Sequence, residues 1–180
     1  MAHIQDGMGT GTLASVDTNN RLNTYSVTTT AEHDATHTFG KGWHIVIQET
    51  PTAAGTFFYF KNTSETVTYI FEGFASRVAS AEAVEIYLNK TGTPSAGTAV
   101  EPCNTNTKYQ SSAINGTIET GTTITGLSNG NLLDRVYLTN TDSKTFNFEL
   151  DVAVAPGGVI IMNAVTGSIA IDMTVHVYAE

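Results

Sequence analysis

The sequence predicts an all-β protein, an antiparallel β-sandwich, and three observations support this. The last third of the chain alternates apolar and polar residues with a period of two, which requires strands with one buried and one wet face. Thr, Ser, Asn and Gly are abundant while charged residues make up only 14% of the chain, a composition typical of short strands joined by tight turns. Roughly nine to eleven segments read as strands and none as a convincing helix.

The centre of the chain is the aromatic-rich stretch 57–71. Two apolar runs flank the polar link 62–66, and this pattern predicts a β-hairpin. Within the first run we expect Phe57 and Tyr59 on the face opposite Phe58, so that both faces are apolar. Such a strand belongs in the middle of a sheet, covered on one side by a second sheet and on the other by a loop or a neighbouring subunit.

Alternating apolar residues predict further strands, including a short one over residues 159–162. We expect a turn-rich segment between Ile118 and Ile124, a tight turn at Asn129-Gly130, and a functional or interfacial loop over residues 91–116. The residues expected to face the core are Trp43, Ile45 and Ile47; Val84, Ile86 and Leu88; Val136 and Leu138; Phe146, Phe148, Leu150, Val152 and Val154; and Ile169, Ile171, Met173, Val175 and Val177.

The sequence predicts an extended N-terminal arm, residues 1–22, and a single β-sandwich domain, residues 23–180. A chain of 180 residues buries enough surface for one core without disulfides or metals. The glycine-rich segment 7–11 lacks the strand and helix that a phosphate-binding loop needs, so we interpret it as part of a flexible arm. Alternation in residues 23–30 predicts an edge strand, and an unpaired edge after a free arm is suited to docking on another subunit.

The charge balance excludes one class of partner. The formal net charge is −9, from 8 Lys and Arg against 17 Asp and Glu. Since this balance repels phosphate backbones and no basic cluster reverses it locally, we expect no nucleic-acid partner. No apolar run approaches the roughly 18 residues of a membrane span, and the N-terminus has no Sec-signal pattern. We therefore expect a soluble protein with no membrane partner.

No catalytic or cofactor-binding motif is recognisable, so we predict that the protein is not an enzyme and needs no cofactor. The segment 32–37, Glu-His-Asp-Ala-Thr-His, is the only cluster with metal-like chemistry, because His33 and His37 would share one face of a helix. It lacks an apolar helical stripe, and we interpret it as a solvated loop rather than a metal site. The single cysteine, Cys103, lies in a polar loop without the context of a nucleophile.

Several segments resemble structural proteins of tailed bacteriophage particles. The opening Ala14–Leu22, the segment Glu32–Ala35 and the aromatic Trp43 resemble the start of such proteins, and Phe58–Asn62 and Gly167–Ile171 resemble their β-sandwich body. Within this group the chain is similar to capsid decoration, or cement, proteins. The resemblance covers nearly the whole chain.

This resemblance implies a jelly-roll module, commonly a homotrimer, that sits on the outer surface of the virion head and clamps neighbouring major capsid subunits after synthesis in the host cytoplasm. It implies no catalytic residues. By the same resemblance the arm would be the anchoring or subunit-exchange element, and its candidate partner-binding residues are Leu13, Val16, Asp17, Arg21 and Leu22. A protein that binds the expanded shell and not its precursor stabilises the shell by mass action.

Two alternatives remain open. One is a receptor-binding or fibre-tip sandwich on the phage tail, in which Trp43 or Tyr109 would stack on a host sugar. For a single Trp at the start of a strand, packing in the core is the favoured interpretation. The other alternative is a cellular carbohydrate-binding module, which usually travels attached to an enzyme or behind a signal peptide.

Overall fold

The computed structural model describes residues 3–5, 13–16, 22–23, 35–36, 39–109, 113–139 and 143–180, with side chains from residue 35 onward except at positions 149 and 150. The chain divides into two compact units, residues 1–30 and 31–180. In the first unit, short strands pair antiparallel in the order β1-β2-β3; they are β1 (His3–Gln5), β2 (Leu13–Val16) and β3 (Leu22–Asn23). The expected extended arm therefore contains paired strands in its described residues, and its boundary at residue 22 stays a prediction.

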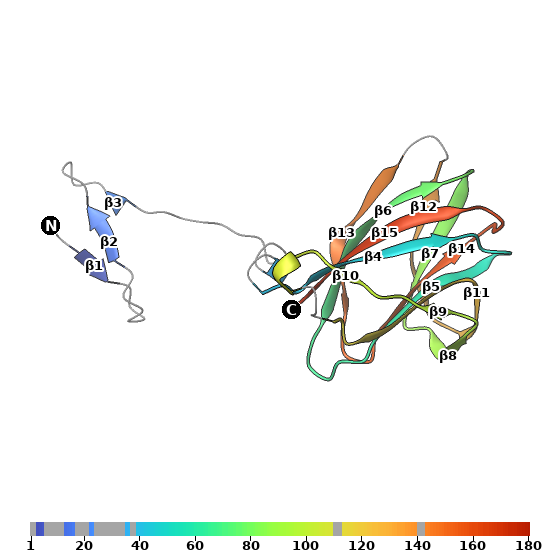
Figure 1. The fold of residues 1–180 in the computed structure, drawn as a ribbon, viewed down its shortest axis with the longest axis horizontal. Coiled ribbons are helices and arrows are strands. Elements are labelled where there is room, and N and C mark those ends of the chain that lie inside the picture. The colour runs from blue at the N-terminus through green and yellow to red at the C-terminus, as the bar shows by residue number, and fades with distance from the viewer. Residues whose placement is uncertain are drawn as a thin grey trace. The chain divides into compact units, whose positions relative to one another are not determined.

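The second unit is the predicted antiparallel β-sandwich (Figure 1). One sheet has the order β10-β4-β15-β6-β13 and consists of β4 (Gly42–Glu49), β6 (Tyr69–Val78), β10 (Cys103–Asn104), β13 (Lys144–Val154) and β15 (Ile171–Ala179). The other has the order β12-β7-β14-β5-β11-β8 with β9 beside β11, and consists of β5 (Gly55–Asn62), β7 (Glu82–Leu88), β8 (Thr91–Ser95), β9 (Thr98–Ala99), β11 (Gly116–Ser128), β12 (Asn131–Leu138) and β14 (Val159–Ala164). A 3₁₀ turn covers Thr107–Tyr109.

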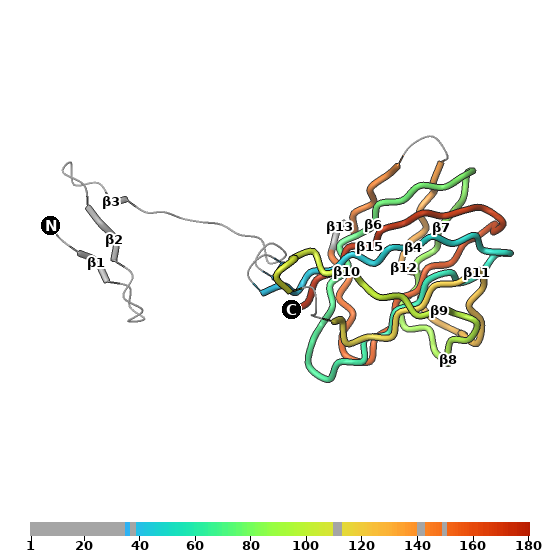
Figure 2. Tube along the Cα trace, in the orientation of Figure 1, coloured from blue at the N-terminus to red at the C-terminus, as the bar shows by residue number. Residues whose placement is uncertain are grey.

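The connectivity of the eight principal strands is that of a jelly roll. The chain alternates between the sheets through β4, β5, β6 and β7, stays in the second sheet for β12, and alternates again through β13, β14 and β15, as Figure 2 allows the reader to follow. The nested orders β4-β15-β6-β13 and β12-β7-β14-β5 result from this path. The segment from β8 to β11 is an insertion between the fourth and fifth principal strands.

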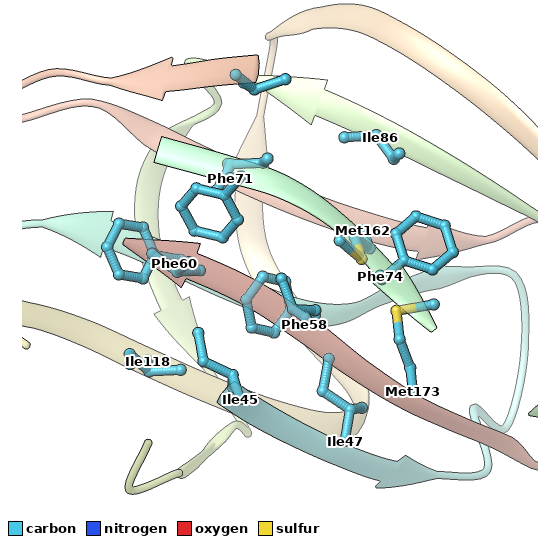
Figure 3. Close-up of a cluster of buried hydrophobic side chains, with 14 of the residues drawn as sticks. Ile45, Ile47, Phe58, Phe60, Phe71, Phe74, Ile86, Ile118, Met162 and Met173 are labelled. Atoms are coloured by element: carbon cyan, nitrogen blue, oxygen red, sulfur yellow. The ribbon is translucent and has the colours of Figure 1, made fainter. Parts of the chain in front are cut away.

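The core lies between the two sheets and is dominated by aromatic rings. Figure 3 shows Phe58 and Phe60 of β5 facing Phe71 and Phe74 of β6, and all four are fully buried. The rings of Phe60 and Phe71 meet edge to face with centroids 5.0 Å apart, a favoured geometry for aromatic pairs. The two aromatic runs thus pack against each other across the sandwich.

The predicted hairpin over residues 57–71 is therefore wrong, because β5 and β6 belong to opposite sheets. Asn62, which is fully buried, turns the chain between them. Its side-chain amide donates to the carbonyls of Val67 and Val154 at 2.8 and 2.9 Å, and its side-chain oxygen accepts from the amide of Ser64. Aromatic runs joined by a polar link fit a corner between sheets as well as they fit a hairpin.

The expected orientation of Phe57 is also wrong. Phe57 is fully buried in the same core cluster as Phe58. The pairing of β5 shifts register at this residue against both β14 and β11, so Phe57 is an extra, bulged residue that does not continue the alternation. The opposite face of β5 carries Tyr59, as expected.

The other predicted core positions are largely confirmed. The described side chains of the alternating sets lie in the core or pack against it on all five strands, β4, β7, β12, β13 and β15, and Ile169 also packs against the core. Leu150 is not among the described side chains. The segment expected to be turn-rich between Ile118 and Ile124 is instead part of one long strand, β11, with an irregular stretch between Thr120 and Ile124. The tight turn at Asn129-Gly130 is confirmed, with φ angles of 58° and 104°.

The second apolar face of β5 is covered by the chain itself. Tyr59 packs with Ile161 and Val159 of β14 and with Ile124 of β11 on the outer side of the seven-stranded sheet. Leu127, farther along β11, packs on the same cluster. The insertion that ends in β11 thus covers this face. From the sequence alone, either a loop or a neighbouring subunit was expected to cover it.

Candidate interaction surface

The eight-residue strand β12 forms one edge of the seven-stranded sheet. Among the described residues only β7 pairs with it. Its outward N–H and C=O groups therefore have no strand partner in the described part of the chain. Such a row of backbone groups is a template for a strand of another chain.

The side chains of β12 that point away from the core are unusually apolar. Leu132 and Leu133 are 51% and 42% exposed, and Tyr137 is 70% exposed. Val165 adds to this group, because its amide bonds to the carbonyl of Ala83, the strand partner of Tyr137. We call Leu132, Leu133, Tyr137 and Val165 the β12 patch; it holds four of the six large exposed apolar side chains among the described residues.

The remaining sheet edges of the sandwich carry features that discourage strand addition. β8 is short and contains Pro94, and β10 has only two residues. β13 begins with the exposed Lys144 and has irregular pairing between Asn147 and Val152. Pro, Lys, short strands and bulges are the means by which natural proteins protect their edges. β12 has a single bulged residue, Leu133, and remains the most apolar edge.

An ion pair fixes the charged part of β12. Arg135 bonds to Glu85, its cross-strand partner on β7, and Glu85 also accepts from the phenol of Tyr87 at 2.9 Å. The Arg135 guanidinium is the main reason that the pKa of Glu85 lies below its usual range, while partial burial opposes the shift. Lys90 lies over the Tyr87 ring at 4.6 Å. The cation of β12 is therefore neutralised within its own sheet.

The five-stranded sheet carries a polar depression of about 220 Å³ on its outer face. Thr36, Glu72, Tyr178 and two histidines, His44 and His176, are among the residues that line it. Among the described residues, no three His, Cys, Asp or Glu side chains are grouped so as to hold a metal ion. Nor does the described part of the chain contain a helix long and apolar enough to cross a membrane.

The predicted partner-binding residues fall on the first unit. Leu13 and Val16 are the ends of β2, and Leu22 begins β3 and pairs with Val16. The structure therefore brings Val16 and Leu22 together in one small sheet. Asp17 and Arg21 lie outside the described residues. The partner-binding role of all five stays a prediction.

The other singled-out residues have clear positions where they are described. Trp43 is 3% exposed and meets Tyr69 edge to face, so it belongs to the core and is not available for stacking on a sugar. Cys103 is exposed on β10. Of the predicted edge strand 23–30 only Asn23, the last residue of β3, is described. Residues 32–34 and 37 of the metal-like segment also lie outside the described residues.

The β12 patch was missed by sequence reasoning. Val136 and Leu138 were recognised as core positions, and the alternation that places them inward also places Tyr137 outward. The sequence signal for an exposed apolar surface was a Tyr placed between Val136 and Leu138, shortly after two consecutive Leu residues. Sequence alone does not indicate that the strand forms an edge.

Comparison of the chain with protein-family models, with curated proteins and with solved structures finds no match.

Proposed function

We propose that the protein is a non-enzymatic structural component of a phage virion that binds the outer surface of the capsid and stabilises the shell. The observation that carries this proposal is the β12 patch, an unprotected apolar edge on a sandwich whose other edges are protected. A jelly roll is a fold of viral capsid domains as well as of lectins and cupins, so it agrees with the proposal at the level of analogy. The expected homotrimer and the major capsid protein as partner belong to the same proposal.

Shell binding uses the physical properties of such a surface. A shell presents many identical sites, so modest contacts repeated by symmetry add up. The acidic net charge of −9 keeps the module from binding DNA. Any protein that binds the mature shell and not its precursor shifts the equilibrium toward the mature shell.

The first experiment is immunogold electron microscopy of particles produced by the genome that encodes this chain. Even labelling of heads is the expected result. Label confined to the tail tip would replace decoration by host-surface binding, and unlabelled particles would favour a cellular carbohydrate-binding module.

The second experiment measures the thermal and osmotic survival of bare cognate capsids with added protein. Wild-type protein should raise survival, whereas Tyr137→Lys should lose at least tenfold in binding because it places a charge in the patch. The matched control is Thr145→Lys on β13, also an exposed position but on a protected edge, which should bind as wild type. Equal binding by both variants would remove the β12 patch from the proposal, and unchanged survival would refute the cement role.

The receptor-binding alternative has one favourable observation. Tyr137 offers an exposed aromatic ring beside the cation of Arg135, a combination that can stack on a sugar. A glycan array separates the two functions, because a decoration protein should show no sugar preference.

A further inference from the structure

A pair of histidines lies on the outer face of the five-stranded sheet. His44 of β4 and His176 of β15 are direct partners in the antiparallel pairing. Trp43 and Ile45 point into the core on one strand, as do Val175 and Val177 on the other, so the alternation directs both imidazoles outward. Their rings are stacked, with centroids 4.6 Å apart and an angle of 25° between the planes.

The surroundings of this pair are negative. Glu72, the bulged residue of β6, lines the same depression as both histidines. A second carboxylate, that of Asp151, accepts from the phenol of Tyr178, another residue of the depression, at 3.5 Å. These carboxylates, on a protein with a net charge of −9, favour a cation at this place over an anion.

We propose that His44 and His176 form a two-histidine clamp for a divalent transition-metal ion such as Zn²⁺ or Ni²⁺, held in this depression across β4 and β15. Imidazole is a preferred ligand of these ions, whereas Mg²⁺ and Ca²⁺ prefer oxygen ligands. The rings are stacked in the free protein, so binding requires both to rotate about their side-chain torsions until one nitrogen of each lies about 2.0–2.1 Å from a common ion. The other ring nitrogen remains able to hydrogen-bond to a neighbouring group.

The clamp leaves coordination positions open. Because no third side chain of the described residues completes a cage, the ion keeps water in the remaining positions, and its affinity should be lower than at a structural zinc site. By joining two central strands, the bound ion would stabilise the folded sheet by mass action. The site is separate from the β12 patch, which lies on the other sheet.

The test is titration of the untagged full chain with ZnCl₂ and NiCl₂, followed by calorimetry and by thermal unfolding. We expect one ion per chain and a rise in Tm, with MgCl₂ giving neither. His44→Asn and His176→Asn should each weaken binding at least tenfold. The matched control is Thr174→Val, whose side chain shares the face of His176 two residues away and should leave binding unchanged.

A second measurement needs no variant of the clamp. Diethylpyrocarbonate modifies accessible histidines, and peptide mass spectrometry should show that Zn²⁺ protects His44 and His176 from modification. Three results would overturn the proposal: no zinc binding by the wild type, binding that survives both clamp substitutions, or protection of other histidines in place of this pair.

Discussion

Two edge strands that follow each other in the chain, β12 and β13, differ in how they meet solvent. β12 presents two leucines and a tyrosine outward and pairs regularly with β7 except at Leu133. β13 presents exposed Lys144 and Asn147 and departs from regular pairing with β6 over several residues. Both bury comparable apolar residues inward, since Leu138 and Phe148 belong to one core cluster.

The difference shows that the fold does not determine the edge chemistry. The same core requirement is met by both strands, while the outward residues and the irregular pairing make the β13 edge less suited to strand addition than the β12 edge. An exposed apolar edge carries an aggregation risk in a free protein, and the partner that we propose for β12 would remove this risk by covering the edge.

The largest expected effect is the loss of stability when an inward residue of β12 is truncated, and it contrasts with truncation of the adjacent outward residue. Leu138→Ala should destabilise the fold by about 2–5 kcal/mol, because it leaves a cavity in the main core. Tyr137→Ala should change the stability of the isolated protein by less than about 0.5 kcal/mol, since that ring is mostly exposed, yet it should weaken shell binding. Urea unfolding measures the first quantity and co-sedimentation with capsids the second. Similar stability losses in both variants would show that Tyr137 is a packing residue and not a contact residue.

A smaller effect is expected at Glu82, which starts β7, the strand that supports β12. This buried carboxylate accepts from the backbone amides of Ala83, Thr166 and Gly167 at 2.8 to 2.9 Å. Glu82→Gln replaces one accepting oxygen by an NH₂ group that faces backbone N–H donors. We expect the free energy of unfolding, measured with urea, to fall by about 1–3 kcal/mol. Glu101→Gln, at an exposed position, is the control and should be neutral. If the two substitutions cost the same, the three hydrogen bonds do not support the strand.

Much of the sandwich follows from local pattern, whereas its surfaces do not. The alternation of Ile171, Met173 and Val175 predicts which side faces the core, because one face of each strand must be buried. Which strands become neighbours depends on contacts between residues far apart in the chain, such as Asn62 with Val154. Periodicity carries no information about these contacts, and for this reason the predicted hairpin was wrong.

The surface sites depend on that same long-range pairing. His44 and His176 are separated by most of the chain and become partners only because β4 and β15 are adjacent. Likewise, Tyr137 is exposed on an edge only because β12 is the last strand of its sheet. The Glu32–His37 segment attracted attention in the sequence because its residues are contiguous, which is the only proximity a sequence displays.

The smallest expected effect concerns the ion pair that neutralises β12. Hydrogen bonding to Arg135 lowers the pKa of Glu85 in the folded state below the usual 4.5. The folded state therefore binds the proton less readily than the unfolded state, so the pair contributes stability above about pH 4.5, and this contribution is lost as the pH falls through the folded pKa. Glu85→Gln should be slightly less stable than wild type at pH 7, and the difference should shrink as the pH falls through the folded pKa, as measured by urea unfolding over a series of pH values. A difference that persists at low pH would mean that packing, not charge, accounts for it. Because the substitution also frees the Arg135 cation, it makes β12 resemble the Lys-bearing edge of β13, and a modest loss of shell binding at pH 7 should accompany it.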